Sequence, residues 1–131
     1  MKLGILGTLS IGALLVGQVT LAETVKIGFV TTLTGGAGAI GNDMRDAVEL
    51  ALDHLGRKMG GSNVKMFYED DTFKPDVGKQ KTEKLVKKDK VHFVTGYIWS
   101  HVLMASRNSV VGKGPFMITS NAGPGPVAGK L

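Results

Sequence analysis

The sequence contains no cysteine, and this absence excludes several kinds of chemistry. Without a thiol, the chain has no disulfide, no thiolate metal site, no cysteine nucleophile and no N-terminal cysteine that could carry a lipid. Charged residues make up 21% of the chain, and the formal net charge is +5. Because 43% of the residues are hydrophobic, the composition indicates a globular protein of one domain, or part of one, and excludes a disordered or fibrous chain.

Residues 1–22 lack acidic side chains and show the pattern of a secretory signal peptide. Lys2 carries the only charge before Glu23, an apolar run follows it, and the small residue Ala22 precedes Glu23. We expect cleavage after Ala22. The alternative is a membrane anchor, because the 20 uncharged residues are just long enough to span a bilayer, but four glycines and several polar residues disfavour it. Residues 23–131 are therefore predicted to be exported, without a stable membrane anchor.

The rest of the chain alternates predicted strands with predicted helices. The strands are expected at 25–30, 64–68, 91–96 and 116–119, and the helices at 42–55, 75–88 and 100–111. This order predicts an α/β fold: a three-layer parallel sheet with right-handed crossovers and helices on both faces. Four such strands with no further helix would leave one edge and one face poorly covered.

Ligands of open parallel sheets bind beyond the carboxyl ends of the strands, at a switch point in the strand order. We therefore expect any site to lie in the four loops that follow the predicted strands, namely 31–41, 69–71, 96–101 and 120–125.

The first of these loops is rich in glycine. Residues 34–41 resemble the nucleotide-binding turn of short-chain dehydrogenases, and Asn121-Ala122-Gly123 resembles a second motif of that family. However, three residues separate the predicted strand from the motif, and no Tyr-x-x-x-Lys is present, since Tyr97 is followed four positions later by His101. An NAD(P)-binding dehydrogenase is therefore kept only as an alternative.

Two charged segments have simpler interpretations than catalysis or nucleic-acid binding. Glu69-Asp70-Asp71 could join His92 and His101 in a metal or acid–base site, but the spacing is unsuitable, and we expect the carboxylates to cap a turn at a strand end. The stretch 74–90 holds seven lysines, but acidic residues interrupt it and few aromatic residues flank it. It predicts a solvated helix face. We therefore expect no bound metal at the acidic segment and no nucleic-acid partner at the lysine-rich one.

The segment 97–101 leaves two interpretations open. Trp99 offers flat apolar contact, and Ser100 offers a hydroxyl at a helix start, where backbone N–H groups favour a carboxylate. Alternatively, Trp99 is a packing residue and Ser100 an ordinary N-cap. No Ser–His–Asp order is evident, so a hydrolase has little support and we assign no catalytic residue.

Taken together, these loops resemble a known family. The matching stretches are 26–35, 41–50, 69–71 with Pro75-Asp76, 94–100 and, most specifically, 118–130, with the sequence Ile-Thr-Ser-Asn-Ala-Gly-Pro-Gly-Pro-Val-Ala-Gly-Lys. They resemble the extracytoplasmic solute-binding proteins of ABC importers, in the branched-chain amino acid (Leu/Ile/Val-binding) group with the type I periplasmic binding fold. Members have two α/β lobes that trap the ligand between them, and this chain matches only the opening part of the first lobe.

The resemblance implies capture of a small carboxylate solute in the periplasm and its delivery to the membrane permease of an ABC importer. It implies no covalent chemistry, so we expect a protein that is not an enzyme and needs no cofactor. Carried over to this sequence, the ligand-binding positions are Ser100 after the third predicted strand and the small residues after the fourth, Asn121, Ala122 and Gly123.

Two further positions bear on the ligand that the resemblance implies. Ile40 stands where some members place an aromatic ring, and Trp99 is more typical of members that take up aromatic acids. Branched-chain amino acids and aromatic acids therefore both remain expected ligands. A ligand-sensing lobe of a receptor would show the same pattern.

Overall fold

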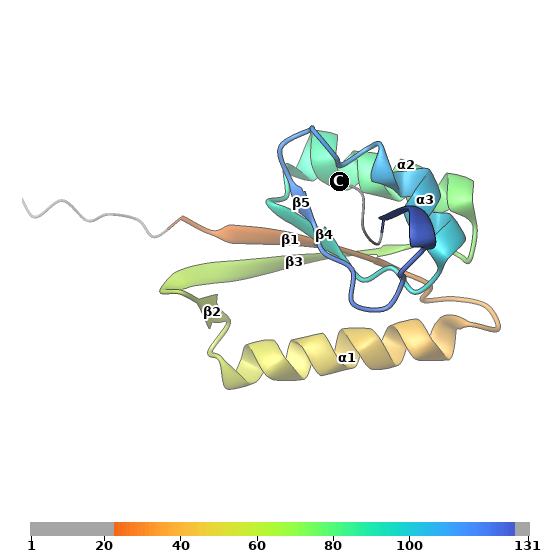
Figure 1. Cartoon of the computed structure of the whole chain (residues 1–131). Coiled ribbons are helices and arrows are strands. Elements are labelled where there is room, and N and C mark those ends of the chain that lie inside the picture. The colour runs from red at the N-terminus through yellow and green to blue at the C-terminus, as the bar shows by residue number, and fades with distance from the viewer. Residues whose placement is uncertain (1–22, 128–131) are drawn as a thin grey trace, which may run out of the picture.

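The computed structural model describes residues 23–127, which form a five-stranded sheet flanked by helices (Figure 1). In chain order the elements are β1 (Val25–Thr31), α1 (Gly38–His54), β2 (Lys58–Met59), β3 (Ser62–Asp70), α2 (Pro75–Lys84), a π-helical turn (Leu85–Asp89), β4 (Phe93–Thr95), α3 (Ser100–Arg107), β5 (Phe116–Met117) and a 3-10 turn (Gly125–Val127). The predicted signal peptide, residues 1–22, lies outside the described residues.

The sheet has the strand order β2-β3-β1-β4-β5, and its last four strands are parallel, as predicted. The central pairing runs from Val25 opposite Val64 to Thr31 opposite Asp70. The expectation of a purely parallel sheet is wrong at one edge, because β2 pairs with β3 in the antiparallel sense. The adjacent glycines Gly60 and Gly61 have φ values of 57° and 83° and make the tight turn between these two strands.

Helices cover both faces of the sheet, which confirms the three-layer prediction. Figure 1 shows α1 along one face and α2 with α3 along the other. The main hydrophobic core lies between the sheet and the α2–α3 pair and consists of Val30, Leu85, Val91, Val94, Tyr97, Val102, Leu103, Val110 and Ala122. Leu85 is fully buried because Gly28 on β1 leaves room for it; a Cβ on Gly28 would stand 2.7 Å from a Leu85 methyl group.

Several predicted boundaries shift. The first helix begins at Gly38, four residues before the predicted start at residue 42, and the Asn42 amide donates within the helix to the carbonyl of Gly38, at 2.8 Å. The third helix ends at Arg107, four residues before the predicted end. The last strand spans only Phe116–Met117.

The face that carries α1 is thinly covered, as the sequence predicted. Of the hydrophobic residues in α1, only Leu52 is buried. On β5 and just beyond it, Phe116 and Ile118 are 68% and 56% exposed. None of the helices within residues 23–127 is both long and apolar enough to cross a membrane.

Candidate functional site

The carboxyl ends of β1 and β4 form a switch point in the sheet. The two strands are neighbours, pairing from Ile27 opposite Phe93 to Phe29 opposite Thr95. After β1 the chain turns to α1 on one face, whereas after β4 it turns to α3 on the other (Figure 1). Loops that diverge in this way leave a crevice at the strand ends, where open α/β sheets bind ligands. The topology therefore supports the loops chosen from the sequence.

The glycine-rich segment makes a close joint between β1 and α1. A Cβ on Gly41 would stand only 1.9 Å from the carbonyl oxygen of Thr32, and one on Gly38 would stand 2.7 Å from that of Leu33. Residues 38–41, predicted as loop, are therefore helical and pressed against the end of β1. Close packing accounts for Gly38 and Gly41, two of the glycines in the segment that resembled a nucleotide-binding turn. Ile40 is part of this first turn and is 46% exposed.

The acidic end of β3 caps the neighbouring loops, as expected. Asp70 accepts hydrogen bonds from the Thr34 hydroxyl at 2.5 Å and from the backbone N–H groups of Leu33 and Thr72 at 2.9 and 2.8 Å. Burial by itself raises the pKa of Asp70, but these hydrogen bonds outweigh it and hold the pKa below its ordinary value. This carboxylate is therefore engaged as a structural acceptor.

The histidines do not join these carboxylates. His92 lies at the opposite end of the sheet, where its Nδ1 accepts from the Lys26 N–H at 3.3 Å. His101 is on the first turn of α3. Within residues 23–127, no group of three or more His, Asp or Glu side chains is arranged to hold a metal ion.

Trp99 is held from two sides at the start of α3. Its indole N–H donates to the Thr32 hydroxyl at 2.9 Å, and its ring meets the Phe73 ring edge-on, with centroids 4.7 Å apart. Trp99 itself is the N-cap residue, because its backbone is extended and its carbonyl accepts from the Leu103 N–H at 3.0 Å. The expectation that Ser100 could be an ordinary N-cap is therefore wrong: Ser100 is the first helical residue, and it is exposed.

A backbone hydrogen bond joins the loops after β4 and β5. The Ala122 N–H donates to the Tyr97 carbonyl at 3.2 Å, and the Ala122 side chain is buried. Asn121 and Gly123, on either side of it, are exposed. The structure thus brings residues 121–123 to the loop that carries Trp99 and Ser100. Ile40 comes from α1, on the other face of the sheet.

Sequence reasoning did not select Thr32 or Phe73 in this region, and it interpreted Asp71 only as part of an acidic turn cap. Thr32 and Asp71 are both fully buried, and the Thr32 hydroxyl donates to Asp71 Oδ1 at 2.5 Å. Phe73 is 48% exposed beside Trp99. A signal was available in the sequence, because polar pairs stand at the ends of two apolar strands, at 31–32 and at 70–71. If these two strands pair in parallel, their carboxyl ends lie side by side, and so do the polar pairs. Nothing in the sequence indicated the position of Phe73, which depends on a left-handed backbone, with φ of 65°.

Tyr97, at the base of the same loop, serves the core. Its side chain is 1% exposed, and its hydroxyl shares a hydrogen bond of 2.6 Å with the hydroxyl of Thr82 on α2. Burial raises the pKa of Tyr97 to about 12, so it stays neutral at physiological pH. This neutral pair anchors the β4–α3 loop to α2.

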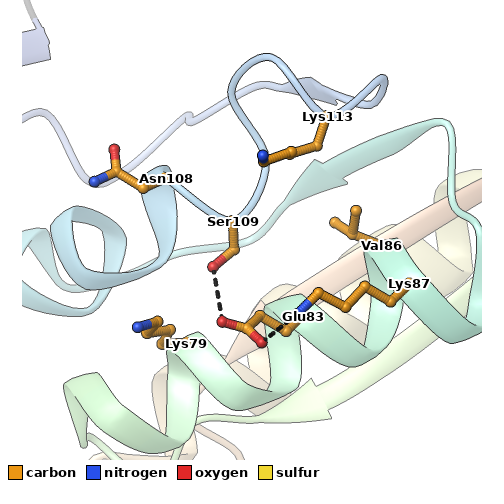
Figure 2. Close-up of a pocket in the computed structure, with 7 residues that line it drawn as sticks. All are labelled: Lys79, Glu83, Val86, Lys87, Asn108, Ser109 and Lys113. Atoms are coloured by element: carbon orange, nitrogen blue, oxygen red, sulfur yellow. Dashed lines mark hydrogen bonds and ion pairs between the residues drawn. The ribbon is translucent and has the colours of Figure 1, made fainter.

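A cavity of about 520 Å³ lies between α2 and the segment that follows α3, and no residue of these loops lines it (Figure 2). It is lined mainly by polar and basic side chains: Lys79, Glu83, Val86, Lys87, Asn108, Ser109 and Lys113. Glu83 accepts from Lys87 at 2.8 Å, and this hydrogen bond holds the pKa of Glu83 below its ordinary value. The basic stretch predicted to be a solvated helix face thus lines an open hollow.

A second cavity lies between α1 and the sheet. It measures about 320 Å³ and is almost entirely apolar; its lining includes Phe29, Val48, Leu52, Leu55 and Met66. It belongs to the thinly covered face of the sheet. Neither cavity is lined by the candidate residues of the switch point.

The fold matches that of one lobe in the type I periplasmic binding proteins. The sequence profile described as "periplasmic binding protein" matches residues 24–130. The chain therefore belongs to the periplasmic binding protein family, in the type I, branched-chain amino acid group.

Individual relatives agree with this assignment. A Leu/Ile/Val-binding protein of Rhizobium johnstonii is 29% identical over 100 residues, which cover 75% of this chain and 27% of the relative. An ABC transporter substrate-binding protein of Sphaerobacter thermophilus superposes with a TM-score of 0.72 at 33% identity, covering 78% of this chain and 28% of that one. A solute-binding protein of R. palustris in complex with 4-hydroxybenzoate superposes with a TM-score of 0.72 at 25% identity, covering 76% of this chain and 27% of that one. The chain thus spans under a third of the length of these proteins.

Proposed function

We propose that this chain supplies the opening part of the first lobe of an exported solute-binding protein, which captures a small carboxylate solute and delivers it to the permease of an ABC importer. The observation that carries this proposal is the meeting of Trp99, Ser100 and residues 121–123 at the switch point, where the Ala122 N–H donates to the Tyr97 carbonyl. In an open α/β sheet this is the expected ligand position.

The chemistry of the loop fits a carboxylate. Ser100 is exposed at the amino end of α3, where unpaired backbone N–H groups and the helix dipole favour an anion. Exposed Asn121 and Gly123 add an amide and an open backbone on the neighbouring loop, which Ala122 joins to the β4–α3 loop. Two relatives are described with amino-acid and 4-hydroxybenzoate ligands, and both ligand classes carry a carboxylate.

A titration followed by NMR tests the assigned residues, because it locates weak as well as tight binding. The 15N-labelled chain is titrated with leucine and with 4-hydroxybenzoate up to millimolar concentrations. We expect chemical-shift changes centred on the amides of Ser100, Asn121 and Gly123. Binding should be weak, because this chain provides only one wall of the proposed cleft.

A matched pair of serine variants sharpens the test. Ser100→Ala should weaken binding by about 1–3 kcal/mol, because the hydroxyl is lost from the carboxylate position. Ser109→Ala, just beyond the other end of α3, should leave the affinity unchanged. Unaltered affinity in Ser100→Ala, or shifts centred on another part of the chain, would refute the assignment.

The proposed periplasmic location follows from cleavage after Ala22. The intact mass of the native product in an envelope fraction tests it, because a cleaved species begins at Glu23. A product that retains Met1 would contradict export through a cleaved signal. A mature species far longer than this sequence would support its proposed place as the opening part of a longer protein.

A further inference from the structure

A chain of hydrogen bonds links the indole of Trp99 to a buried carboxylate. The indole N–H donates to Thr32 Oγ1 at 2.9 Å, and the Thr32 hydroxyl donates to Asp71 Oδ1 at 2.5 Å. The directions are fixed, because an indole N–H can only donate, so the single hydroxyl proton of Thr32 must go to the carboxylate. Both Thr32 and Asp71 are fully buried, so water does not compete for these bonds. The arrangement holds the indole in one orientation.

The same carboxylate also holds a strained turn. Thr72 and Phe73 follow Asp71 with φ values of 49° and 65°, in the left-handed region that non-glycine residues seldom adopt. The Phe73 N–H donates to Asp71 Oδ1 at 2.9 Å, and the Thr72 N–H donates to Asp70 at 2.8 Å. Strain of this kind persists only where surrounding contacts enforce it, and it clusters at binding sites.

The strained turn places the Phe73 ring against the candidate site. Phe73 meets Trp99 edge-on at 4.7 Å between ring centroids and meets His101 at 5.0 Å. Trp99 is thus held by a hydrogen bond on one side and by an aromatic ring on the other. Since Trp99 is also the N-cap residue of α3, its anchored indole lies on the residue that directly precedes Ser100, the first residue of the helix.

We propose that Thr32 is a positioning residue of the capture site: through Trp99 it presets the aromatic wall and the amino end of α3 before the ligand arrives. Phe73 completes the aromatic wall. The predicted effect of Thr32 on ligand affinity rests on the proposed function. Because the wall is formed in advance, ligand binding does not have to order it, and affinity is gained without a further contact.

The test uses Trp99 as its own probe, because it is the only tryptophan in the chain. Thr32→Val removes both hydrogen bonds and keeps the shape of the side chain. We expect it to reduce the near-UV circular dichroism and the fluorescence anisotropy of Trp99, and to weaken 4-hydroxybenzoate binding about 5- to 20-fold in the NMR titration. Thr32→Ser, which retains a hydroxyl, should restore all three signals.

Thr34→Val is the matched control. It removes a hydrogen bond of the same kind, from a threonine hydroxyl to Asp70 at 2.5 Å, in the same loop, without touching Trp99. It should leave the tryptophan signals and the affinity at the wild-type values. If Thr32→Val keeps the wild-type tryptophan signals and affinity, the proposal is overturned. It is also overturned if Thr34→Val loses as much signal and affinity as Thr32→Val, because a merely structural role of the hydroxyl predicts equal losses in both variants.

If Thr32→Val does not fold, Trp99→Phe decides the question, because it removes the indole donor and leaves the Thr32–Asp71 bond intact. It should show the same 5- to 20-fold loss of affinity, and unchanged affinity would overturn the proposal. The two proposals also fail separately. If the wild-type chain shows no shift at Ser100 with any probe, the proposed function fails, while the tryptophan signals of Thr32→Val still show whether Thr32 positions Trp99.

Discussion

Replacing Gly41 with alanine should open the joint between β1 and α1. In a helix interior this change alone would stabilise the chain by about 1 kcal/mol, because alanine is the better helix former. Here the new Cβ would stand 1.9 Å from the carbonyl oxygen of Thr32, although real Cβ contacts essentially never fall below 3.0 Å. The backbone must therefore separate by about 1 Å, because a carbonyl in the main chain cannot rotate away as a flexible side chain can.

The magnitude follows from these opposing effects. Overpacking against rigid surroundings costs about 3 kcal/mol at the upper end of its usual range. After subtraction of the gain in helix propensity, we expect Gly41→Ala to lower the free energy of unfolding by about 2 kcal/mol. For a domain of this size, the loss corresponds to a fall in Tm of about 8–16 °C.

Gly36→Ala is the matched control in the same glycine-rich segment. A Cβ on Gly36 would meet nothing within 4 Å, and its φ is not in the left-handed region. This variant should keep or slightly raise Tm, because alanine restricts the unfolded chain. Thermal unfolding of both variants by far-UV circular dichroism measures the difference. A Gly41→Ala variant that melts at as high a temperature as Gly36→Ala would refute the explanation of Gly41 by close packing.

Two further predictions concern the core and an ion pair. Leu85→Ala should lower the free energy of unfolding in urea by about 3 kcal/mol, because Leu85 is 0% exposed. Leu50→Ala, at a site that is 58% exposed, should change it by less than about 0.5 kcal/mol. Similar losses in the two variants would contradict the assigned core. Burial by itself raises the pKa of Glu69, but hydrogen bonds from Lys84 and Lys81 outweigh it and hold the pKa below its ordinary value of 4.5. Its ionised form therefore stabilises the fold above about pH 4.5 and loses that effect as the pH falls through the lowered pKa. The wild-type chain should lose stability more steeply towards pH 3 than the Glu69→Gln variant does. Equal losses of stability in the two chains would refute this explanation.

Several features could be predicted because they depend on local pattern. The apolar run that begins at Val25 and the recurrence of Val48 and Leu52 at helical spacing predict a strand and a helix from neighbouring residues alone. The alternating order then leaves few topologies, because parallel crossovers are right-handed. The location of Ser100 at a helix start near the carboxyl edge follows from the same reasoning, and its role as a ligand residue stays a prediction.

Other features depend on contacts between distant residues, and only the tertiary structure shows them. Gly41 permits a close approach to Thr32, whereas the sequence pattern alone left a nucleotide-binding turn as an alternative. The hydrogen bonds from Trp99 through Thr32 to Asp71 join residues that are 67 and 39 positions apart, and the exposure of Phe73 requires a left-handed backbone. The sequence alone determined the order of the four parallel strands and the three main helices, and the edge where we expect a site, because these follow from local periodicity and chain connectivity. Only the tertiary structure decided which buried side chains hold that edge in place, because hydrogen bonds and close packing depend on where distant segments meet.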